Sequence, residues 1–252
     1  MMKKSVTVVS GKGGTGKSFV TCNAAVVLAG AGFKTLIVDA DTTMASVEIL
    51  YGISPEKTLQ HLVAGEARPE EVVYEGPNGT LVVPAGAKLR RRIRPSELDA
   101  AISSVLEVVE PDYLLIDAAA GLDADVVTSV MMTEYHAIVC NPEITSLADA
   151  YKVKVVLNGK SRYLGAVMNK VGRMELSKFR VTGLIGPILA AIPDDSKVKE
   201  SINSGVPYVL KHPESIVTKQ IFKFASAIAG VELQPDGKGK RLGFLKKKKQ
   251  EA

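Results

Sequence analysis

The sequence has little cysteine, few histidines and no long hydrophobic run. Its two cysteines, Cys22 and Cys140, lie far apart, which argues against a disulfide scaffold or a cysteine-rich metal site and is typical of a reducing compartment. The histidines His61, His136 and His212 are scattered without a metal ligand at useful spacing, so we expect surface or structural roles for them. No apolar run approaches the roughly 18 residues that cross a bilayer, and the N-terminus lacks a signal-peptide core. These absences favour a cytoplasmic protein.

The rest of the composition is that of an ordinary globular protein, and 252 residues are enough for one α/β domain. The net charge of +5 is unevenly spread. Residues 237–252 hold seven lysines and arginines against one glutamate, a charge of +6, which leaves −1 for residues 1–236. We therefore expect attraction to phosphates or acidic lipids to act mainly through this C-terminal tail.

Short apolar runs alternate with longer helical patterns along the chain. The runs are apolar on both faces, as in parallel strands that helices cover on each side. The pattern predicts strands at residues 6–9, 35–38, 81–83, 113–116, 137–139, 164–168 and 187–190. It predicts helices at 18–28, 96–109, 123–132, 144–157 and 215–229. We expect an α/β fold, a three-layer, doubly wound, mostly parallel sheet flanked by helices, in residues 1–234, and a flexible basic tail at 235–252.

A glycine-rich segment follows the first predicted strand and opens the first predicted helix. It fits the pattern G-x-x-x-x-G-K-[ST], in which backbone N–H groups and a helix N-terminus bind phosphates. The pattern assigns Lys17 to the β and γ phosphates and the hydroxyl of Ser18 to Mg²⁺. A glycine-rich turn without a ligand is the alternative, and the strand before it and the helix after it disfavour that reading. The segment predicts a nucleotide site formed by Gly11, Lys12, Gly13, Gly14, Thr15, Gly16, Lys17, Ser18 and Phe19.

A second lysine, Lys12, lies early in the same loop. The run from Lys12 to Ser18, Lys-Gly-Gly-Thr-Gly-Lys-Ser, resembles the deviant Walker A motif of the MinD/ParA superfamily of P-loop ATPases. The resemblance implies that Lys12 reaches across a nucleotide-sandwich dimer to the phosphates of the partner subunit. Positive charge would then reach the transition state only after dimerisation.

Two predicted strands end in aspartate. Asp39 and Asp41 follow the second strand, where α/β sheets bind ligands, and Asp41 points the same way as Asp39 if the chain stays extended. The resemblance implies that Asp41 positions or activates the attacking water. Asp117 ends the strand at 113–116 as in a Walker B motif and is expected to hold Mg²⁺ through water. Ala119 stands where the family has proline, which puts the stiffness of switch II in doubt, and Gly121 still allows close approach to a γ-phosphate.

Later segments extend the resemblance. Residues 140–147, Cys-Asn-Pro-Glu-Ile-Thr-Ser-Leu, are similar to a segment of the MinD branch, with Cys140 in place of threonine, and we expect Cys140 to be a small buried residue. Residues 167–171 are similar to a run whose asparagine reads the adenine edge, which implies that Asn169 donates to and accepts from adenine. Residues 192–195 and 205–207 resemble the loop that closes over the base, which implies a contact at Pro193.

The resemblance, which runs from residue 3 to about residue 230, implies an ATP hydrolase that depends on Mg²⁺. It would cycle between a monomer and an ATP-sandwiched homodimer, hydrolyse ATP slowly without a protein activator, and act in spatial positioning such as division-site placement. ATP or ADP and Mg²⁺ are the implied cofactors. Catalysis would rest on Lys12, Lys17 and Asp41, and metal binding on Ser18, Asp41 and Asp117.

Other functions use the same fold. A ParA-type partition ATPase binds DNA, which the charge of −1 in residues 1–236 disfavours, although the basic cluster Lys88, Arg90, Arg91, Arg92 and Arg94 keeps that alternative open. A metal-cluster carrier needs paired cysteines at the dimer axis, and two isolated cysteines are too few. Single-turnover phosphate release distinguishes a hydrolase from a pure binding module.

The tail carries its own resemblance. Residues 240–247, Lys-Arg-Leu-Gly-Phe-Leu-Lys-Lys, resemble the amphipathic membrane-targeting end of bacterial MinD. On a helix, Leu242 and Leu245 share a face, with Phe244 beside it. This apolar part covers barely one turn, so one copy is expected to bind anionic membrane weakly and two copies in an ATP dimer far better. We expect ATP-dependent, peripheral contact with the inner face of the cell membrane, and a disordered solubilising tail is the alternative.

Overall fold

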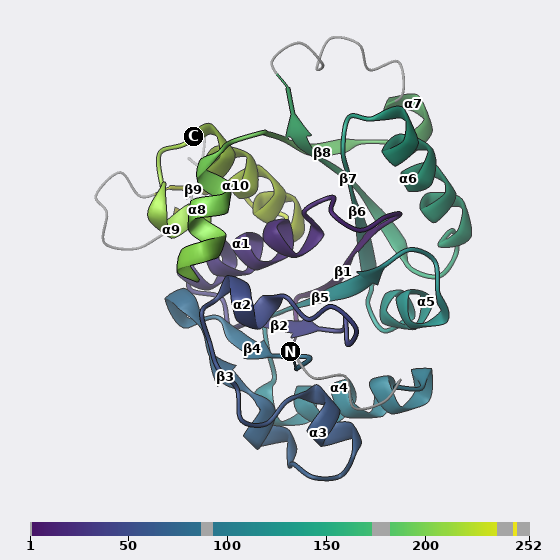
Figure 1. The fold of residues 1–252 in the computed structure, drawn as a ribbon, viewed down its shortest axis with the longest axis vertical. Coiled ribbons are helices and arrows are strands. Elements are labelled where there is room, and N and C mark those ends of the chain that lie inside the picture. The colour runs from purple at the N-terminus through teal and green to yellow at the C-terminus, as the bar shows by residue number, and fades with distance from the viewer. Residues whose placement is uncertain (1, 87–92, 173–181, 236–243, 246–252) are drawn as a thin grey trace, which may run out of the picture.

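The computed structural model describes residues 2–86, 93–172, 182–235 and 244–245, and the structural statements below concern these residues. Within them an eight-stranded sheet has the order β3-β4-β2-β5-β1-β6-β7-β8 (Figure 1). Neighbouring strands are parallel, except that β3 pairs antiparallel with β4. The strands are β1 (Lys4–Ser10), β2 (Thr35–Asp39), β3 (Tyr74–Glu75), β4 (Leu81–Val83), β5 (Tyr113–Ala120), β6 (Tyr135–Cys140), β7 (Arg162–Val171) and β8 (Ile188–Pro193).

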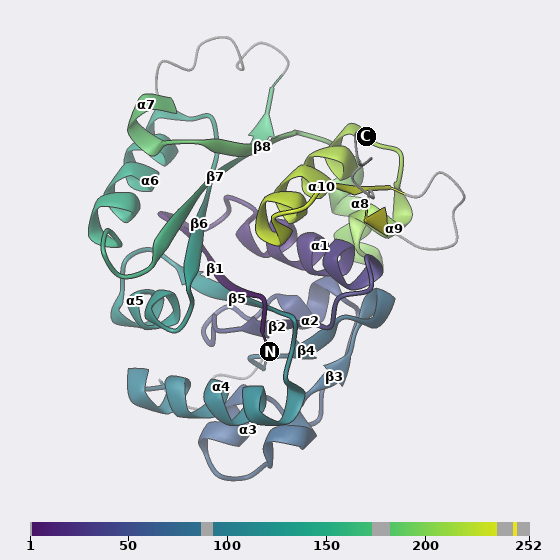
Figure 2. The same cartoon turned by 180° about the vertical axis from the view of Figure 1, so that it is seen from behind.

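Helices cover both faces of this sheet (Figures 1 and 2). They are α1 (Lys17–Gly30), α2 (Val47–Leu50), α3 (Leu59–Val63), α4 (Pro95–Val109), α5 (Ala124–Met131), α6 (Ile144–Val156), α7 (Thr182–Ile185), α8 (Lys197–Ser204), α9 (Tyr208–Lys211) and α10 (Ile216–Ala229). Side chains of β5 alternate between the two faces: Leu115 packs in the core under α1 and α10, and Leu114 and Ile116 pack under α4. The predicted three-layer, mostly parallel sheet is therefore confirmed.

The ends of the long helices follow from local sequence. The hydroxyl oxygen of Ser215 accepts a hydrogen bond from the backbone N–H of Thr218 at 3.0 Å, which caps the start of α10, and α10 ends at Gly230 with a φ of 72°. Pro95 opens α4, since its missing N–H is not needed in a first turn. Each strand and helix predicted from the sequence is present.

The short elements were not predicted. The edge strand β3 and the one- or two-turn helices α2, α3, α7, α8 and α9 are too short to show a hydrophobic period, and contacts with the rest of the fold decide them. None of the described helices combines the length and the apolar character that crossing a bilayer requires.

The tail departs from the expected helix where it is described. Phe244–Leu245 form β10, which pairs antiparallel with β9 (Leu233–Gln234), so their backbone is extended rather than helical. Backbone pairing with the body supplies hydrogen bonds that one isolated helical turn cannot match. Leu242 and the lysines of residues 246–249 lie outside the described residues.

Both cysteines are buried with 1% exposure, Cys22 in α1 and Cys140 at the end of β6. Burial raises the pKa of Cys140 to about 12 and the pKa of Cys22 well above its usual value, with Asp117 and Asp39 adding to the second shift. The prediction that Cys140 is a small buried residue is confirmed.

Candidate phosphate-binding site

The loop of residues 11–16 joins β1 to α1 at the carboxyl end of the central strands (Figure 1). Gly16 has a φ of 87°, and a Cβ atom there would lie 2.2 Å from the Nδ2 atom of Asn169. Gly11 has a different reason to be glycine, because its Cβ would lie 2.6 Å from the Cβ of Asp149 on α6. Glycine is therefore needed at both ends of the loop: at Gly16 for the left-handed backbone conformation, and at Gly11 for the close approach of α6.

Two residues that end β7 hold the loop in place. The Nδ2 atom of Asn169 donates to the carbonyl oxygen of Thr15 at 2.8 Å, and the Nζ atom of Lys170 donates to the carbonyl oxygen of Gly14 at 2.8 Å. Lys170 has a φ of 57°, which is uncommon outside glycine. The amide nitrogen of Asn169 is thus bonded to the loop and its amide oxygen is left to accept a bond, whereas we expected both atoms to contact adenine. Lys170 was not singled out, because its role depends on a fold that brings β7 to the loop.

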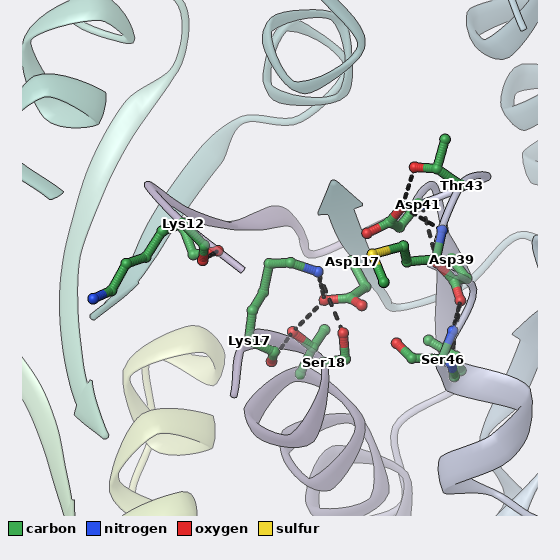
Figure 3. Close-up of polar contacts among 12 residues, drawn as sticks. Lys12, Lys17, Ser18, Asp39, Asp41, Thr43, Ser46 and Asp117 are labelled. Atoms are coloured by element: carbon green, nitrogen blue, oxygen red, sulfur yellow. Dashed lines mark hydrogen bonds and ion pairs between the residues drawn. The ribbon is translucent and has the colours of Figure 1, made fainter. Parts of the chain in front are cut away.

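Lys17 lies in a buried ion pair with Asp117. Their Nζ and Oδ1 atoms are 2.9 Å apart, and the side chains are 7% and 0% exposed. The hydroxyl of Thr21 donates to the same oxygen at 3.1 Å, a contact that the sequence motif did not reveal. The Nζ atom of Lys17 also donates to the hydroxyl oxygen of Ser18 at 3.3 Å, so these side chains lie together (Figure 3).

The donor set fits a magnesium ion and a phosphate. The Oδ2 atom of Asp117 and the hydroxyl of Thr15 are buried and have no hydrogen-bond partner among the described residues. Buried oxygens without partners are rare and mark a position for a ligand or water. Ser18 and Asp117 supply the hydroxyl and carboxylate oxygens that Mg²⁺ prefers. The residues that would hold the ion are therefore side by side.

The carboxylate of Asp39 is buried and accepts hydrogen bonds from nearby backbone N–H groups. The strand β2 ends at Asp39, whose Oδ1 atom accepts from the backbone N–H of Asp41 at 3.0 Å. Its Oδ2 atom accepts from the N–H groups of Ser46 and Val47 at the start of α2, at 2.9 and 3.1 Å (Figure 3). The strand thus stops at Asp39, and the carboxylate of that residue, rather than a neighbouring strand, accepts from the N–H of Asp41. Burial, together with the charge of Asp117, raises the pKa of Asp39 to about 7.

Asp41 lines a cavity of about 390 Å³ together with residues at the end of β5 and just after it. Its Oδ1 atom accepts from the hydroxyl of Thr43 at 2.9 Å and from the backbone N–H of Met44 at 3.0 Å. These bonds orient a partly exposed carboxylate toward a space bordered by Ala119 and Ala120. A water molecule held there has an acceptor at hand.

Lys12 points away from Lys17 (Figure 3). Its Nζ atom lies 2.8 Å from the Oε2 atom of Glu143 and 3.4 Å from the hydroxyl of Thr145, just before and within α6. The hydrogen bond and charge of Lys12 lower the pKa of Glu143. Glu143 lay inside a segment noted in the sequence, but its pairing with Lys12 was not foreseen.

The remaining predicted residues lie around the loop. Phe19 is 6% exposed and packs its ring edge-on against Tyr208, so its backbone rather than its side chain faces the phosphate position. Gly121 has a φ of 99° and donates its N–H to the carbonyl oxygen of Ser10 at 2.9 Å. Pro193 ends β8 and is half-buried.

Known proteins share this arrangement. An uncharacterised ATP-binding protein of Methanocaldococcus jannaschii is 33% identical over 98% of this chain and 96% of its own. The septum site-determining protein MinD of Pyrococcus horikoshii, solved with Mg-ADP, is 33% identical, covers 89% of this chain and 95% of its own, and superimposes with a TM-score of 0.81. The cell division ATPase MinD of Pyrococcus furiosus is 33% identical with a TM-score of 0.77, over 91% of this chain and 99% of its own.

The family assignment rests on most of the chain. Residues 6–208 match the CobQ/CobB/MinD/ParA nucleotide binding domain, and this range contains the phosphate loop and every lysine and carboxylate described above. The predicted relationship is confirmed: the chain belongs to the CobQ/CobB/MinD/ParA family of nucleotide-binding proteins.

Proposed function

We propose that this chain is a Mg²⁺-dependent ATPase that alternates between a monomer and an ATP-sandwiched homodimer and acts in spatial positioning, such as division-site placement. The observation that carries the proposal is the direction of Lys12. Lys17 pairs with Asp117 inside the site, whereas Lys12 reaches outward to Glu143, which supports a role for Lys12 in another subunit.

Each residue has a task in this scheme. The N–H groups of the loop bind phosphate oxygens, and Lys17 leaves Asp117 to neutralise their charge. Ser18 and Asp117 hold Mg²⁺, which when bound offsets charge on the phosphates. Asp41 positions the attacking water as an acceptor, with Thr43 and the N–H of Met44 fixing its carboxylate. Without Lys12 of a second copy the site lacks one cation, and hydrolysis is slow.

The pair between Lys12 and Glu143 gives the monomer a resting position for that lysine. Since the pair is exposed, it exchanges readily with water and with other anions. Dimerisation would replace Glu143 by phosphate oxygens of the partner subunit. We expect Glu143→Gln to weaken the resting position without removing Lys12 from the reaction.

The test combines light scattering after size exclusion with phosphate release. The variant Asp41→Ala is expected to form a stable dimer in ATP and to remain a monomer in ADP. Lys12→Ala is expected to bind ATP yet to stay monomeric and to lose hydrolysis. The proposal is wrong if Lys12→Ala hydrolyses ATP at the parental rate.

We also propose that the base is adenine. The amide oxygen of Asn169 can accept from the adenine amino group while its nitrogen holds the loop. The guanine-reading pattern N-K-x-D ends here in Gly172 rather than aspartate. In a competition titration ATP should displace a bound nucleotide at far lower concentration than GTP does, and equal displacement would refute adenine selectivity.

The last part of the proposal concerns the C-terminal tail. We propose that the protein is cytoplasmic and that this tail contacts the membrane peripherally. The pairing of β10 with β9 must open before residues 242–245 can form a membrane-bound helix. Sedimentation with anionic liposomes, in ATP and in ADP, of the full chain and of a chain ending at Pro235 tests this. Loss of ATP dependence, or binding by the shortened chain, would exclude the tail as anchor.

Binding to DNA is the competing outcome, as in partition ATPases. The basic cluster that favours it lies mostly outside the described residues, and Arg94, which is described, pairs with Glu97 at 2.7 Å. Sedimentation with DNA in ATP is the matching measurement. A protein activator or cargo remains part of the proposal in either case.

A further inference from the structure

A second cavity, of about 370 Å³, lies at the end of the sheet opposite the phosphate loop. His136 and Tyr163 line it from the second positions of the parallel strands β6 and β7, whereas the loop lies at the carboxyl end of the sheet. The outer wall is α6, through Tyr151, Lys154 and Val155. The volume falls at the lower end of the range for small-molecule sites. None of these residues belongs to the proposed ATP site.

His136 is the buried polar group of this cavity. It is 1% exposed, and its Nδ1 atom lies 2.8 Å from the hydroxyl oxygen of Ser161. Its Nε2 atom is buried and has no hydrogen-bond partner among the described residues. Burial lowers the pKa of His136 to about 4, so the ring is neutral at neutral pH. When Ser161 donates to Nδ1, the proton resides on Nε2 and an N–H group is left for a ligand.

Lys154 adds a positive charge. Its Nζ atom donates to the carbonyl oxygen of Leu184 at 3.0 Å and lies 5.5 Å from the centre of the Tyr163 ring. No ion pair of Lys154 is recorded in the described part of the chain, and Asp149, the acidic residue on the same helix, pairs with Lys152. An ammonium group has three donors, of which the carbonyl takes one. A cation beside an imidazole that presents an N–H group in one of its two tautomers favours an anion.

The rest of the lining combines the polar side chains of Asn158 and Ser161 with the larger apolar surface of Tyr151, Val155 and Tyr163. The rings of His136 and Tyr163 lie with centroids 5.3 Å apart, and the hydroxyl of Tyr163 is already donated to the carbonyl oxygen of Ile185. Tyr163 therefore offers its ring rather than its hydroxyl. At the mouth, Tyr151 is 43% and Val155 is 55% exposed, which leaves apolar surface to be covered.

We propose that this cavity binds a small carboxylate with a planar apolar body, such as an aromatic acid. The carboxylate accepts from the Nζ atom of Lys154 and the Nε2 atom of His136, and the body lies against the ring of Tyr163 and the side chain of Val155. One cation and one neutral donor suit a single negative charge, whereas phosphate is commonly bound by arrays of backbone N–H groups or by arginine.

Titration with benzoate tests the site, with the nitrogen resonances of the histidine rings as the readout. The chain has three histidines, and His136→Gln identifies the signal of His136. We expect benzoate to shift that signal in a saturable way below about 10 mM. Benzamide, which lacks the charge, and acetate, which lacks the planar body, should each bind at least about tenfold more weakly.

Matched variants separate the site from general charge effects. Lys154→Gln keeps a donor for the carbonyl of Leu184 but removes the charge, and it should weaken benzoate binding about tenfold. Lys152→Gln removes a charge from the same helix outside the cavity and should leave binding unchanged. ATP binding should be unaffected in both variants, so this test is independent of the proposed ATPase.

Three results would overturn the proposal. The first is the absence of a saturable shift at His136. The second is binding of benzamide or inorganic phosphate as tight as that of benzoate. The third is an equal effect of Lys152→Gln and Lys154→Gln, which would assign the shift to the overall charge of α6.

Discussion

Lys12 in the phosphate loop and Lys17 at the start of α1 form ion pairs of nearly the same length in very different surroundings. Lys17 and Asp117 are 2.9 Å apart with side chains 7% and 0% exposed, and Lys12 and Glu143 are 2.8 Å apart with side chains 34% and 61% exposed. Water screens the second pair and is excluded from the first. The distance is therefore a poor guide to strength. The buried pair holds the site together, and the exposed pair is free to exchange its partner.

Breaking the buried pair should give the largest effect. Lys17→Ala leaves the carboxylate of Asp117 buried without its cation, and we expect the free energy of unfolding to fall by about 3–5 kcal/mol. ATP binding should be lost as well. Urea denaturation and calorimetric titration measure the two losses. The double variant Lys17→Ala/Asp117→Asn should recover part of the stability but none of the binding, and a single variant as stable as the parent would contradict the comparison.

Asp41 belongs to neither ion pair, so its replacement tests catalysis separately from stability. Asp41→Ala should lower the turnover of ATP by about 10²- to 10⁴-fold while ATP binding and stability stay near the parental values, because Asp41 is partly exposed and its proposed role is to position the attacking water. Single-turnover phosphate release is the measurement. Thr43→Ala keeps the carboxylate and removes one donor that orients it, so its loss should be smaller. An equal loss in the two variants would argue against a direct role for Asp41.

A group at the opposite end of the sheet should respond to acid. The pKa of His136 is lowered to about 4 in the folded protein. As the pH falls below 6.5, the imidazole is therefore protonated in the unfolded chain while it stays neutral in the folded chain. This contribution to stability is present above pH 6.5 and is lost as the pH falls toward 4. Between pH 7 and pH 5 it amounts to at most about 2 kcal/mol. Urea denaturation of the parent and of His136→Gln at both pH values isolates this contribution. If the free energy of unfolding changes equally in the two proteins between pH 7 and pH 5, the prediction is wrong.

Breaking the exposed pair should have the smallest effect on stability. Lys12→Ala is expected to change the free energy of unfolding by less than about 1 kcal/mol, since an exposed ion pair contributes little. Thermal denaturation compares it with Lys17→Ala under the same conditions. Similar losses of stability in the two variants would mean that solvent exposure does not determine how much each ion pair contributes.

The sequence predicted the parts of the site that depend on backbone and spacing. The position of the phosphate loop, the aspartate Asp117 within β5 and the long helices follow from local pattern, because strand, glycine turn and helix are consecutive in the chain. Parallel strands then bring their carboxyl ends to one edge, which places Asp117 beside the loop.

Contacts between distant residues were harder to predict. The pairing of Lys12 with Glu143 spans 131 positions, and the bond from Asn169 to Thr15 spans 154, so no local pattern contains them. The bonds that the carboxylate of Asp39 accepts from the N–H groups of Ser46 and Val47 were not foreseen either, because they depend on where α2 begins. The strand at Phe244–Leu245 depends on a partner segment that helical periodicity does not consider.

The burial of Cys22 and Cys140 gives this protein a built-in reporter of its own unfolding. Alkylating reagents and oxidants react with the thiolate, and burial keeps both thiols protonated in the folded chain. Since the chain contains no other cysteine, a mass increase of two adducts marks a molecule that has opened as a whole. Exposure to a maleimide would therefore count open molecules directly, without an engineered cysteine.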